Sequence, residues 1–532
     1  LMAFLKKRLF VIFLFFYFLI GSTNSINTGI SFDENYEQLN WDFNVKLVKD
    51  ISNSILTDQQ FDKDKFNDEV KSFVGYGIGF QIISQPIQFL VKNFIDSDNN
   101  LEIYGAKLLS KHFVVFLFFF VSGIFFYLIL RKIIENVNCC SLGTIIYLTY
   151  PYLFGQSMFS PKDIPFMSVW LICTFLILNL FEKLVDKKKI DYKSIIILSI
   201  TTAYLLSIRI AGLLIFIQYI FTLLIFLNIN KIKLNTFLKK YYLIFITFIF
   251  TFTLFLFLFY PIFWIDPLLI IETIKISSQH FNNVGTTTLG EIMYAGDLPV
   301  TYLIIWFAVK LPLLVLIGLI IVPFVEKKIF NDKKKAIIFG SLLATLLTII
   351  FILILRRVHL YDEIRQVMFL VPLIFIISTV AIFTFSRNFF KFFGVITVLF
   401  FIAENIKINP YQYVWFNLPS RYLDLTKNFE LEYQGISGRE ISKYIINRKP
   451  QESCILANPL LGVKLFLKNT EYICFDIWQK IETDYQRPFL AVQNVRNLKR
   501  SIPYKCKPIY ETNFKLFFHK KKITTGKLLR CE

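Results

Sequence analysis

Long apolar runs, separated by short loops rich in Lys and Arg, constrain the fold of this chain more than any other feature. Each run approaches the roughly 20 residues that an α-helix needs to cross the hydrocarbon core of a bilayer. The composition agrees, because 55% of the 532 residues are hydrophobic, 62 are Phe, and the mean hydropathy is +0.55. A soluble protein of this length would need more polar surface. The sequence therefore predicts an all-α polytopic membrane protein.

The basic loops indicate a topology of about eleven transmembrane helices. Lys and Arg collect in the cytoplasmic loops of membrane proteins, and here the strongly basic short loops, such as 187–189 and 333–335, all fall on one side of the predicted bundle. This pattern accounts for the formal net charge of +20 without nucleic acid as a partner. The N-terminus is then inside, and we expect a multi-pass protein of the plasma (inner) membrane. Eight of the spans are placed near residues 113–130, 139–154, 165–181, 194–208, 211–228, 241–260, 336–355 and 393–404.

The first apolar run, 10–20, leaves two interpretations open. It is either a retained transmembrane helix or a signal peptide that ends near "GSTNS". In both cases Asp33 and Glu34 follow it on the external, periplasmic side. The apolar stretch 75–90 is too mixed to span, so we expect it to lie along the outer interface as an amphipathic helix.

The composition changes near residue 404 and predicts two domains. Residues 1–404 are expected to form a transmembrane domain with interfacial external loops. Residues 405–532 are polar and are expected to form a small external α/β domain. Within it, 437–448 suits a helix. The expected short buried strands are 453–458, 472–478 and 488–495.

Four cysteines fall in the predicted external domain, where the compartment permits disulfides. Their spacing matches no zinc pattern. We predict a bridge between Cys454 and Cys474, which lie in two runs typical of neighbouring strands, with free buried thiols as the alternative. The pairing of Cys506 and Cys531 stays open.

Ionisable side chains gather on the predicted outer face. Any one of them is explained equally well as a solvated loop charge, but the set is not. Lys310 lies inside the outer half of a span, where a charge is costly unless it faces a partner or a cavity. The ionisable side chains on the predicted outer face are Asp33, Glu34, Lys162, Asp163, Arg209, His280, Lys310, His359, Tyr361, Asp362 and Arg365.

Several motifs resemble one family of membrane enzymes. "DENYEQLNW" looks like the acidic motif in the first external loop of glycosyltransferase C superfamily enzymes, and "FSPKDIPFMSVW" is similar to the "NPKDIPF" segment of bacterial glycosyltransferase family 39. "LYDEIRQVMFLVP" follows in the expected order, and the resemblance covers roughly residues 32–439. That family includes protein O-mannosyltransferases and aminoarabinose transferases of the cell envelope. Ser160 stands where Asn is usual and Gln366 where His is usual, and neither change removes an acid.

The resemblance implies a glycosyltransferase C fold and an inverting transfer of a hexosyl or pentosyl group from a polyprenyl-phosphate donor. A hydroxyl acceptor needs a carboxylate base to take its proton, and a phosphate leaving group needs cations. Asp33 is the expected general base, with Glu34 supporting the loop or a bound cation. Arg365 is expected to bind the donor phosphate. Its expected helpers are Lys310, Arg209 and Lys162.

Asp163 is expected to be a second acid that faces the same cavity as Asp33. Pro161 and Pro165 bracket it, so "PKDIP" is predicted to be a stiff elbow before the fourth span. The alternative is that Asp163 caps that helix. Two nearby acids leave a divalent cation open, although no cofactor is certain. Further candidates for the site are His280, His359, Tyr361 and Asp362.

Two other classes of function compete with the enzyme. A transporter or channel would use Arg209 and Lys310 as pathway charges, and it predicts charges deep in several spans and broken repeats, which the sequence does not show. A non-enzymatic assembly or receptor protein predicts little convergence of charge in the loops before the last domain. Within the enzyme class, the sugar stays open, and the acceptor is a protein, a lipid or a glycan.

Overall fold

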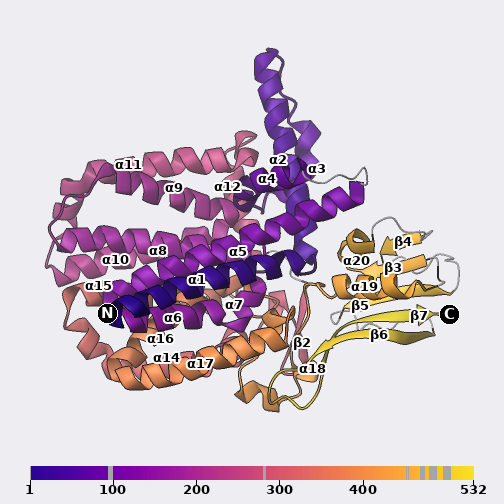
Figure 1. Cartoon of the computed structure of the whole chain (residues 1–532). Coiled ribbons are helices and arrows are strands. Elements are labelled where there is room, and N and C mark those ends of the chain that lie inside the picture. Colours follow the sequence, from indigo (N-terminus) through magenta and orange to yellow (C-terminus); the bar gives the residue numbers. More distant parts are fainter. Residues whose placement is uncertain are drawn as a thin grey trace.

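The computed structural model describes residues 2–93, 100–279, 283–450, 452, 454–467, 474–477, 488–494 and 505–532. Most of them form a bundle of helices that run side by side, with a small sheet domain at one end (Figure 1). We call that end of the bundle the sheet end. The opposite end is called the lysine end, because the basic loops around 187–189 and 231–233 lie there.

The bundle contains a helix for each of the eleven predicted spans. By length and composition, eight candidate spans lie in the described residues, and a pair of helices bent by 118° makes a ninth. The predicted spans 139–154 and 194–208 correspond to α6 (Val137–Thr149) and α9 (Tyr192–Ile208), apolar helices of 13 and 17 residues that are shorter than a candidate span. This confirms the prediction of an all-α multi-pass membrane protein. The bundle helices are α1 (Met2–Asn27), α5 (Asn100–Ile133), α6 (Val137–Thr149), α8 (Asp163–Val185), α9 (Tyr192–Ile208), α10 (Ile215–Ile229), α11 (Leu234–Phe259), α13 (Tyr302–Lys310), α14 (Leu313–Phe330), α15 (Lys333–Leu355), α16 (Val371–Phe385) and α17 (Arg387–Lys407).

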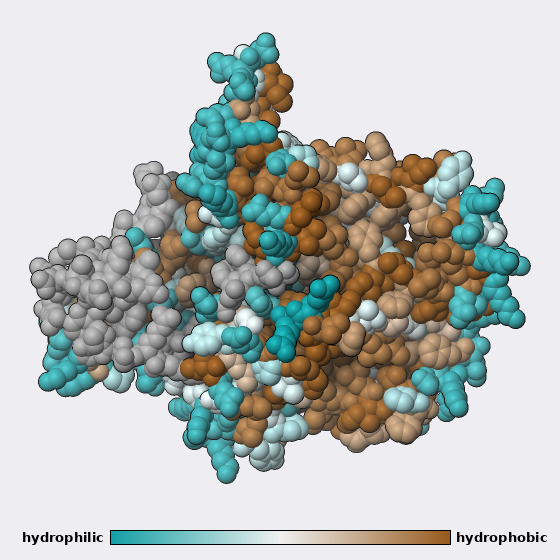
Figure 2. Space-filling view, turned by 180° about the vertical axis from the view of Figure 1, so that it is seen from behind, coloured by the Kyte–Doolittle hydropathy of each residue, from teal (hydrophilic) through white to brown (hydrophobic). Residues whose placement is uncertain are grey.

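The outer surface of the bundle suits hydrocarbon. Figure 2 shows a broad hydrophobic band, bounded by hydrophilic side chains at the lysine end. Large apolar side chains of the bundle are exposed, including Phe250 at 69%, Phe324 at 76% and Phe351 at 62%. A continuous patch of this kind would promote aggregation in water. In a bilayer it needs no protein partner, because lipid tails are as apolar as the side chains.

The bent pair α13–α14 forms a fixed corner at Pro312, which has no backbone N–H to continue the first helix. Polar side chains from elsewhere in the chain satisfy carbonyls that the break leaves free. The Asn417 amide donates to the Leu311 carbonyl at 2.9 Å, and the Tyr150 hydroxyl donates to the Lys310 carbonyl at 2.7 Å. Such partners are required where irregular backbone is surrounded by apolar material.

Shorter helices lie at the sheet end. Figure 1 shows α2 (Phe32–Leu56) running across the direction of the bundle helices. The predicted amphipathic stretch forms most of α4 (Gly79–Asn93), in which Phe89 is 65% exposed. The remaining helices outside the bundle and the sheet domain are α3 (Asn67–Phe73), α7 (Pro151–Gln156), α12 (Leu269–Gln279) and α18 (Leu425–Asn428). A two-stranded hairpin, β1 (Gly285–Thr288) and β2 (Glu291–Tyr294), follows α12.

The C-terminal region forms a five-stranded mixed sheet with the order β4-β3-β5-β7-β6. β3 pairs in parallel with β4 and β5, whereas β7 is antiparallel to β5 and β6. The helix and strands expected from the sequence are found as α19, β3, β4 and β5. The element bounds are α19 (Gly438–Arg448), β3 (Cys454–Asn458), α20 (Leu460–Leu467), β4 (Cys474–Ile477), β5 (Phe489–Asn494), β6 (Cys506–Phe514) and β7 (Ile523–Cys531).

A disulfide between Cys506 and Cys531 joins β6 to β7. Cys454 is also disulfide-bonded, and Cys474 is its register partner on the neighbouring strand. The side chain of Cys474 lies outside the described residues, so the Cys454–Cys474 bridge stays a prediction.

Candidate functional site

Arg365 gathers carboxylates from three separate parts of the chain at the sheet end. Its Nη2 lies 2.9 Å from Asp33 Oδ2, its Nε lies 3.2 Å from Asp163 Oδ2, and its Nη1 lies 3.6 Å from Asp362 Oδ2. Asp33 lies in the first turn of α2, Asp163 begins α8, and Asp362 lies in the loop before the 3₁₀-helix that Arg365 starts. We call these four side chains and Arg209 the Arg365 cluster. The predicted convergence of acids and bases is therefore found in the structure.

Arg209 closes the cluster from the end of α9. Its Nη2 lies 2.7 Å from Asp163 Oδ1, so Asp163 is shared between two guanidinium groups. The Ser160 hydroxyl donates to Asp163 Oδ2 at 3.2 Å. Asp163 is the first residue of α8 rather than its N-cap, and Lys162 at the cap makes no side-chain capping bond. The side chain of Asp163 thus serves the cluster and does not cap the helix, and the helix begins inside the predicted "PKDIP" elbow.

The three carboxylates on Arg365 differ in exposure. The Asp33 side chain is 44% exposed, whereas those of Asp163 and Asp362 are 2% and 3% exposed. Arg365 itself is 7% exposed. Asp33 is therefore the acid of the cluster that is open to solvent.

Glu34 points elsewhere and has a structural role. One carboxylate oxygen accepts the Ser31 backbone N–H at 2.6 Å, and the other lies 2.9 Å from His112 Nε2. The expectation that Asp33 and Glu34 occupy an irregular loop is wrong, because both lie in the first turn of α2. An acid at this position satisfies a backbone donor at the helix start and interacts favourably with the helix dipole.

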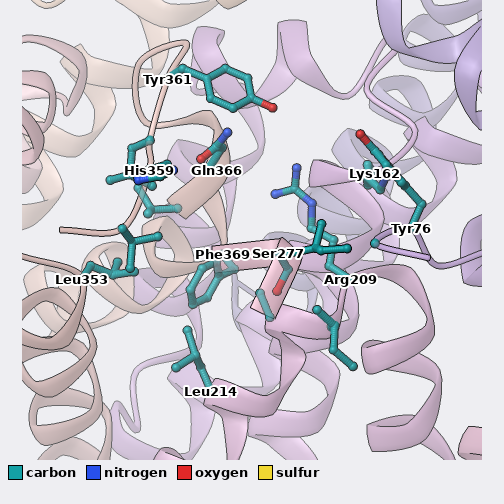
Figure 3. A pocket seen from close by; sticks show the side chains of 17 residues that line it. Tyr76, Lys162, Arg209, Leu214, Ser277, Leu353, His359, Tyr361, Gln366 and Phe369 are labelled. Atoms are coloured by element: carbon teal, nitrogen blue, oxygen red, sulfur yellow. The ribbon is translucent and has the colours of Figure 1, made fainter. Parts of the chain in front are cut away.

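A cavity of about 170 Å³ adjoins the cluster (Figure 3). Arg209 and Lys162 line it, and Lys162 Nζ lies 2.6 Å from Glu37 Oε1 and 4.0 Å from the centre of the Tyr76 ring. Burial raises the pKa of Tyr361 to about 12, so its phenol is a neutral hydrogen-bond donor at physiological pH. Other side chains in the lining are Tyr76, Ser277, His359, Gln366 and Phe369.

Lys310 lies apart from this cavity. Its Nζ is 2.7 Å from Glu363 Oε1, and both side chains are 0% exposed. Burial raises the pKa of Glu363, and the adjacent Lys310 ammonium opposes that rise. Asp362 and Glu363 both have positive φ, 55° and 68°, so the buried pair holds a strained loop that leads into Arg365.

The sequence interpretation missed Glu37, Tyr76 and Glu363. Ser31 and Glu34 have the Ser-x-x-Glu spacing of a capping box, which marks a helix start. Once α2 is placed there, Glu37 lies one turn after Asp33 on the same face. No comparable local signal exists for Glu363, whose partner is brought to it by the fold.

Two further expectations concern a histidine and a metal. His280 lies outside the described residues, whereas His359 lines the cavity. Among the described side chains, no group of three or more His, Cys, Asp or Glu is arranged to hold a metal ion. In the cluster, the position between the three carboxylates is occupied by the Arg365 guanidinium.

The chain matches no protein-family model and no curated protein sequence. Among solved structures, it is similar to the crystal structure of ArnT from Cupriavidus metallidurans in the apo state, with a TM-score of 0.43, 10% sequence identity, and coverage of 84% of this chain and 87% of that chain. The crystal structure of the same ArnT bound to undecaprenyl phosphate is similar with a TM-score of 0.41, 10% identity, and coverage of 83% and 87%.

Proposed function

We propose that this protein is a membrane glycosyltransferase that transfers a sugar from a polyprenyl-phosphate donor to an acceptor hydroxyl. One observation carries the proposal: the exposed carboxylate of Asp33 is held by Arg365, which also contacts Asp163, and Asp163 pairs with Arg209. Arg209 and Lys162 line the neighbouring cavity. The reaction needs a base for the acceptor and fixed cations for the phosphate, and the site supplies both. The sequence motifs that resemble glycosyltransferase family 39 contain Asp33, Lys162 and Arg365.

Asp33 is the proposed general base. It takes the proton of the acceptor hydroxyl while the oxygen attacks the anomeric carbon from the face opposite to the phosphate. The bond between that carbon and the phosphate oxygen breaks, and polyprenyl phosphate leaves with the electron pair. Attack from the opposite face inverts the configuration of the sugar. A positioned base of this kind contributes on the order of 10²–10⁴ in rate.

Arg209 and Lys162 are the proposed ligands of the donor phosphate. Each is fixed by a buried acid, Asp163 and Glu37 respectively, so little reorganisation is needed when the phosphate gains charge. Arg365, like Asp33 and Asp163, does not line the cavity. Because it contacts both acids, we assign it the task of orienting them. Lys310 is assigned a similar positioning role through Glu363.

The pairing of the cations also bears on the rival transporter function. Arg209 and Lys310, the candidate pathway charges, each have a carboxylate within 2.7 Å. A neutralised and buried pair such as Lys310–Glu363 suits a fixed scaffold better than a moving charge.

We propose that the sheet end faces the periplasm and the lysine end faces the cytoplasm, because Lys and Arg favour the cytoplasmic side. Single cysteines at Lys188 and Asn409 test this orientation with a membrane-impermeant thiol reagent. The reagent should label Asn409→Cys in intact cells and Lys188→Cys only after lysis. Labelling of both positions in intact cells would contradict the orientation.

The enzymatic proposal is tested with membranes that contain the protein and a radiolabelled polyprenyl-phosphate hexose. We expect label to move into an acceptor, and its recovery in the protein, lipid or glycan fraction identifies the acceptor class. Asp33→Asn should lower transfer by on the order of 10²–10⁴. Asp50→Asn is the matched control, because Asp50 lies on the same helix in a surface pair with Lys65 at 2.7 Å, and such pairs contribute little. Equal transfer by both variants would refute the proposal.

Asp163→Ser tests the second acid. The change removes the charge that Arg209 and Arg365 share while keeping a small polar side chain at the start of α8. We expect a folded, inserted and inactive protein. A folded variant with normal transfer would show that Asp163 is dispensable for the reaction.

A further inference from the structure

A second cavity lies between α8, α9, α10 and α11, toward the lysine end. Its volume is about 300 Å³, and we call it the lysine-end cavity. Leu180 lines it, 17 residues after Asp163 on α8, which places it about 26 Å from the Arg365 cluster at 1.5 Å per residue. The cavity is therefore separate from the proposed donor site. Among its lining residues are Phe181, Leu198, Tyr219, Ile244 and Phe245.

The lining suits a hydrocarbon chain and not water. All of the lining side chains are aliphatic or aromatic, and the Tyr219 hydroxyl is already hydrogen-bonded to Thr202 at 2.8 Å. A buried water needs two to four polar partners, and apolar cavities without them stay dry. The volume lies at the lower end of the roughly 300–1,000 Å³ range of ligand pockets.

The cavity is bounded by a peripheral helix. Only 11% of the α11 span is buried, so this helix faces the bilayer. α11 is kinked at Tyr241, where φ is −116° and ψ is 17°, and Tyr241 itself lines the cavity. α10 and α11 meet through ring pairs Phe226–Phe237 and Phe216–Phe252. A chain from the surrounding lipid thus needs to pass only one outer helix.

Exposed lysines stand beside the lining. Lys189 directly precedes Ile190, and Lys240 directly precedes Tyr241; both Ile190 and Tyr241 line the cavity. Within the described part of the chain, no ion pair neutralises either lysine. Basic side chains at the end of an apolar pocket between transmembrane helices select anionic lipid head groups. Further exposed lysines of the same loops are Lys187, Lys231, Lys233 and Lys239.

We propose that the lysine-end cavity binds one acyl chain of an anionic phospholipid, whose head group lies on Lys189 and Lys240. The lipid comes from the leaflet opposite to the one in which the proposed donor phosphate lies. It fills a void that would otherwise leave the lining side chains without contacts, and it fixes α11 against the bundle. The site concerns lipid binding alone and does not rest on the proposed transfer reaction.

Tryptophan quenching in nanodiscs tests the proposal on the full-length protein. The nanodiscs contain phosphatidylcholine with a small fraction of phosphatidylglycerol that carries brominated acyl chains. Phe245→Trp places the probe in the lining, and Ile246→Trp is the matched control, since Ile246 is the next residue, at nearly the same depth, and is 58% exposed. The six native tryptophans are common to both variants and cancel in the comparison.

We expect the brominated phosphatidylglycerol to quench Phe245→Trp more strongly than Ile246→Trp and to saturate at low lipid fraction. Brominated phosphatidylcholine should quench both variants alike, and adding Lys189→Gln with Lys240→Gln should remove the preference for phosphatidylglycerol. Equal quenching of the two variants by brominated phosphatidylglycerol would overturn the proposal. Displacement by polyprenyl phosphate but not by phosphatidylglycerol would assign the cavity to the carrier chain and would also overturn it.

A second measurement uses the unaltered protein and so does not depend on the folding of a variant. Phosphatidylglycerol with a photoactivatable acyl chain is cross-linked in the same nanodiscs, and the adducts are mapped by mass spectrometry. We expect adducts on Tyr219 and Tyr241 in excess of those on Tyr242, which is 56% exposed to the bulk lipid. Adducts confined to Tyr242 and other outward side chains would contradict the site.

Discussion

Replacing Arg365 by Lys tests whether the geometry of the cluster, and not its charge alone, supports the reaction. The guanidinium uses three separate nitrogens on three carboxylates, whereas an ammonium is a point charge on a flexible stem. Asp163 keeps its contact with Arg209 at 2.7 Å, so the contact that matters is the one to Asp33 at 2.9 Å. The scale of such a charge-assisted contact is roughly 1.5–3 kcal/mol. At about 1.4 kcal/mol for each tenfold change, Arg365→Lys should lower kcat roughly 10- to 150-fold.

The measurement is steady-state transfer from the labelled donor by the purified protein in proteoliposomes. If Arg365 orients the base, the loss falls on kcat and the KM for the donor changes little. If Arg365 instead binds the donor phosphate, the KM rises. Arg421→Lys is the control for general destabilisation, since Arg421 is fully buried in a two-point pair with Glu404 and lies outside the cavity lining. Wild-type kcat and KM in Arg365→Lys would refute both roles.

Three other predictions concern the pair Asp33 and Glu34, the buried Glu363, and the Cys506–Cys531 bridge. Asp33→Asn should lower transfer by on the order of 10²–10⁴. Glu34→Gln keeps an acceptor for the Ser31 N–H but removes the charge at the start of α2 and beside His112, so it should lower thermal stability and keep turnover per folded molecule. Near-full turnover in Asp33→Asn and loss in Glu34→Gln would reverse the roles. Burial raises the pKa of Glu363 from 4.5 to about 8, so the folded protein binds a proton more tightly than the unfolded chain. Its free energy of unfolding should therefore fall as the pH rises from about 4.5 to about 8, and Glu363→Gln should flatten that slope in fluorescence-monitored unfolding. Cys506→Ala opens a loop with a sequence separation of 25 and should cost about 3 kcal/mol, seen as faster amide exchange in β6 and β7; unchanged exchange would show that the bridge adds nothing.

The helical architecture was predictable because its signals are local. Hydropathy gives the length of each span, and the side on which Lys and Arg fall gives its direction. The corner at Pro312 was harder to predict from the sequence. A Pro in an apolar run indicates a break, but the 118° angle depends on Asn417 and Tyr150, which reach the corner from distant parts of the chain.

The same difference between local signals and long-range contacts applies to the candidate site. The topology alone brought Asp33, Asp163, Arg209 and Arg365 to one end of the bundle, and the structure places them in direct contact. The capping-box spacing of Ser31 and Glu34 indicates that Glu34 turns back toward the helix start, but the sequence interpretation overlooked it. For Lys310, the cost of a charge inside a span correctly indicated a partner. The identity of that partner depends on a left-handed loop that no pattern predicts.

The corner between α13 and α14 also constrains how the chain is made. The Asn417 amide that caps the Leu311 carbonyl is 106 residues further along the chain. At synthesis rates of roughly 5–20 residues per second, several seconds pass between the two. Throughout that interval the corner must enter the membrane without its final partner. The insertion machinery or water then has to satisfy the Leu311 carbonyl until α15, α16 and α17 have followed.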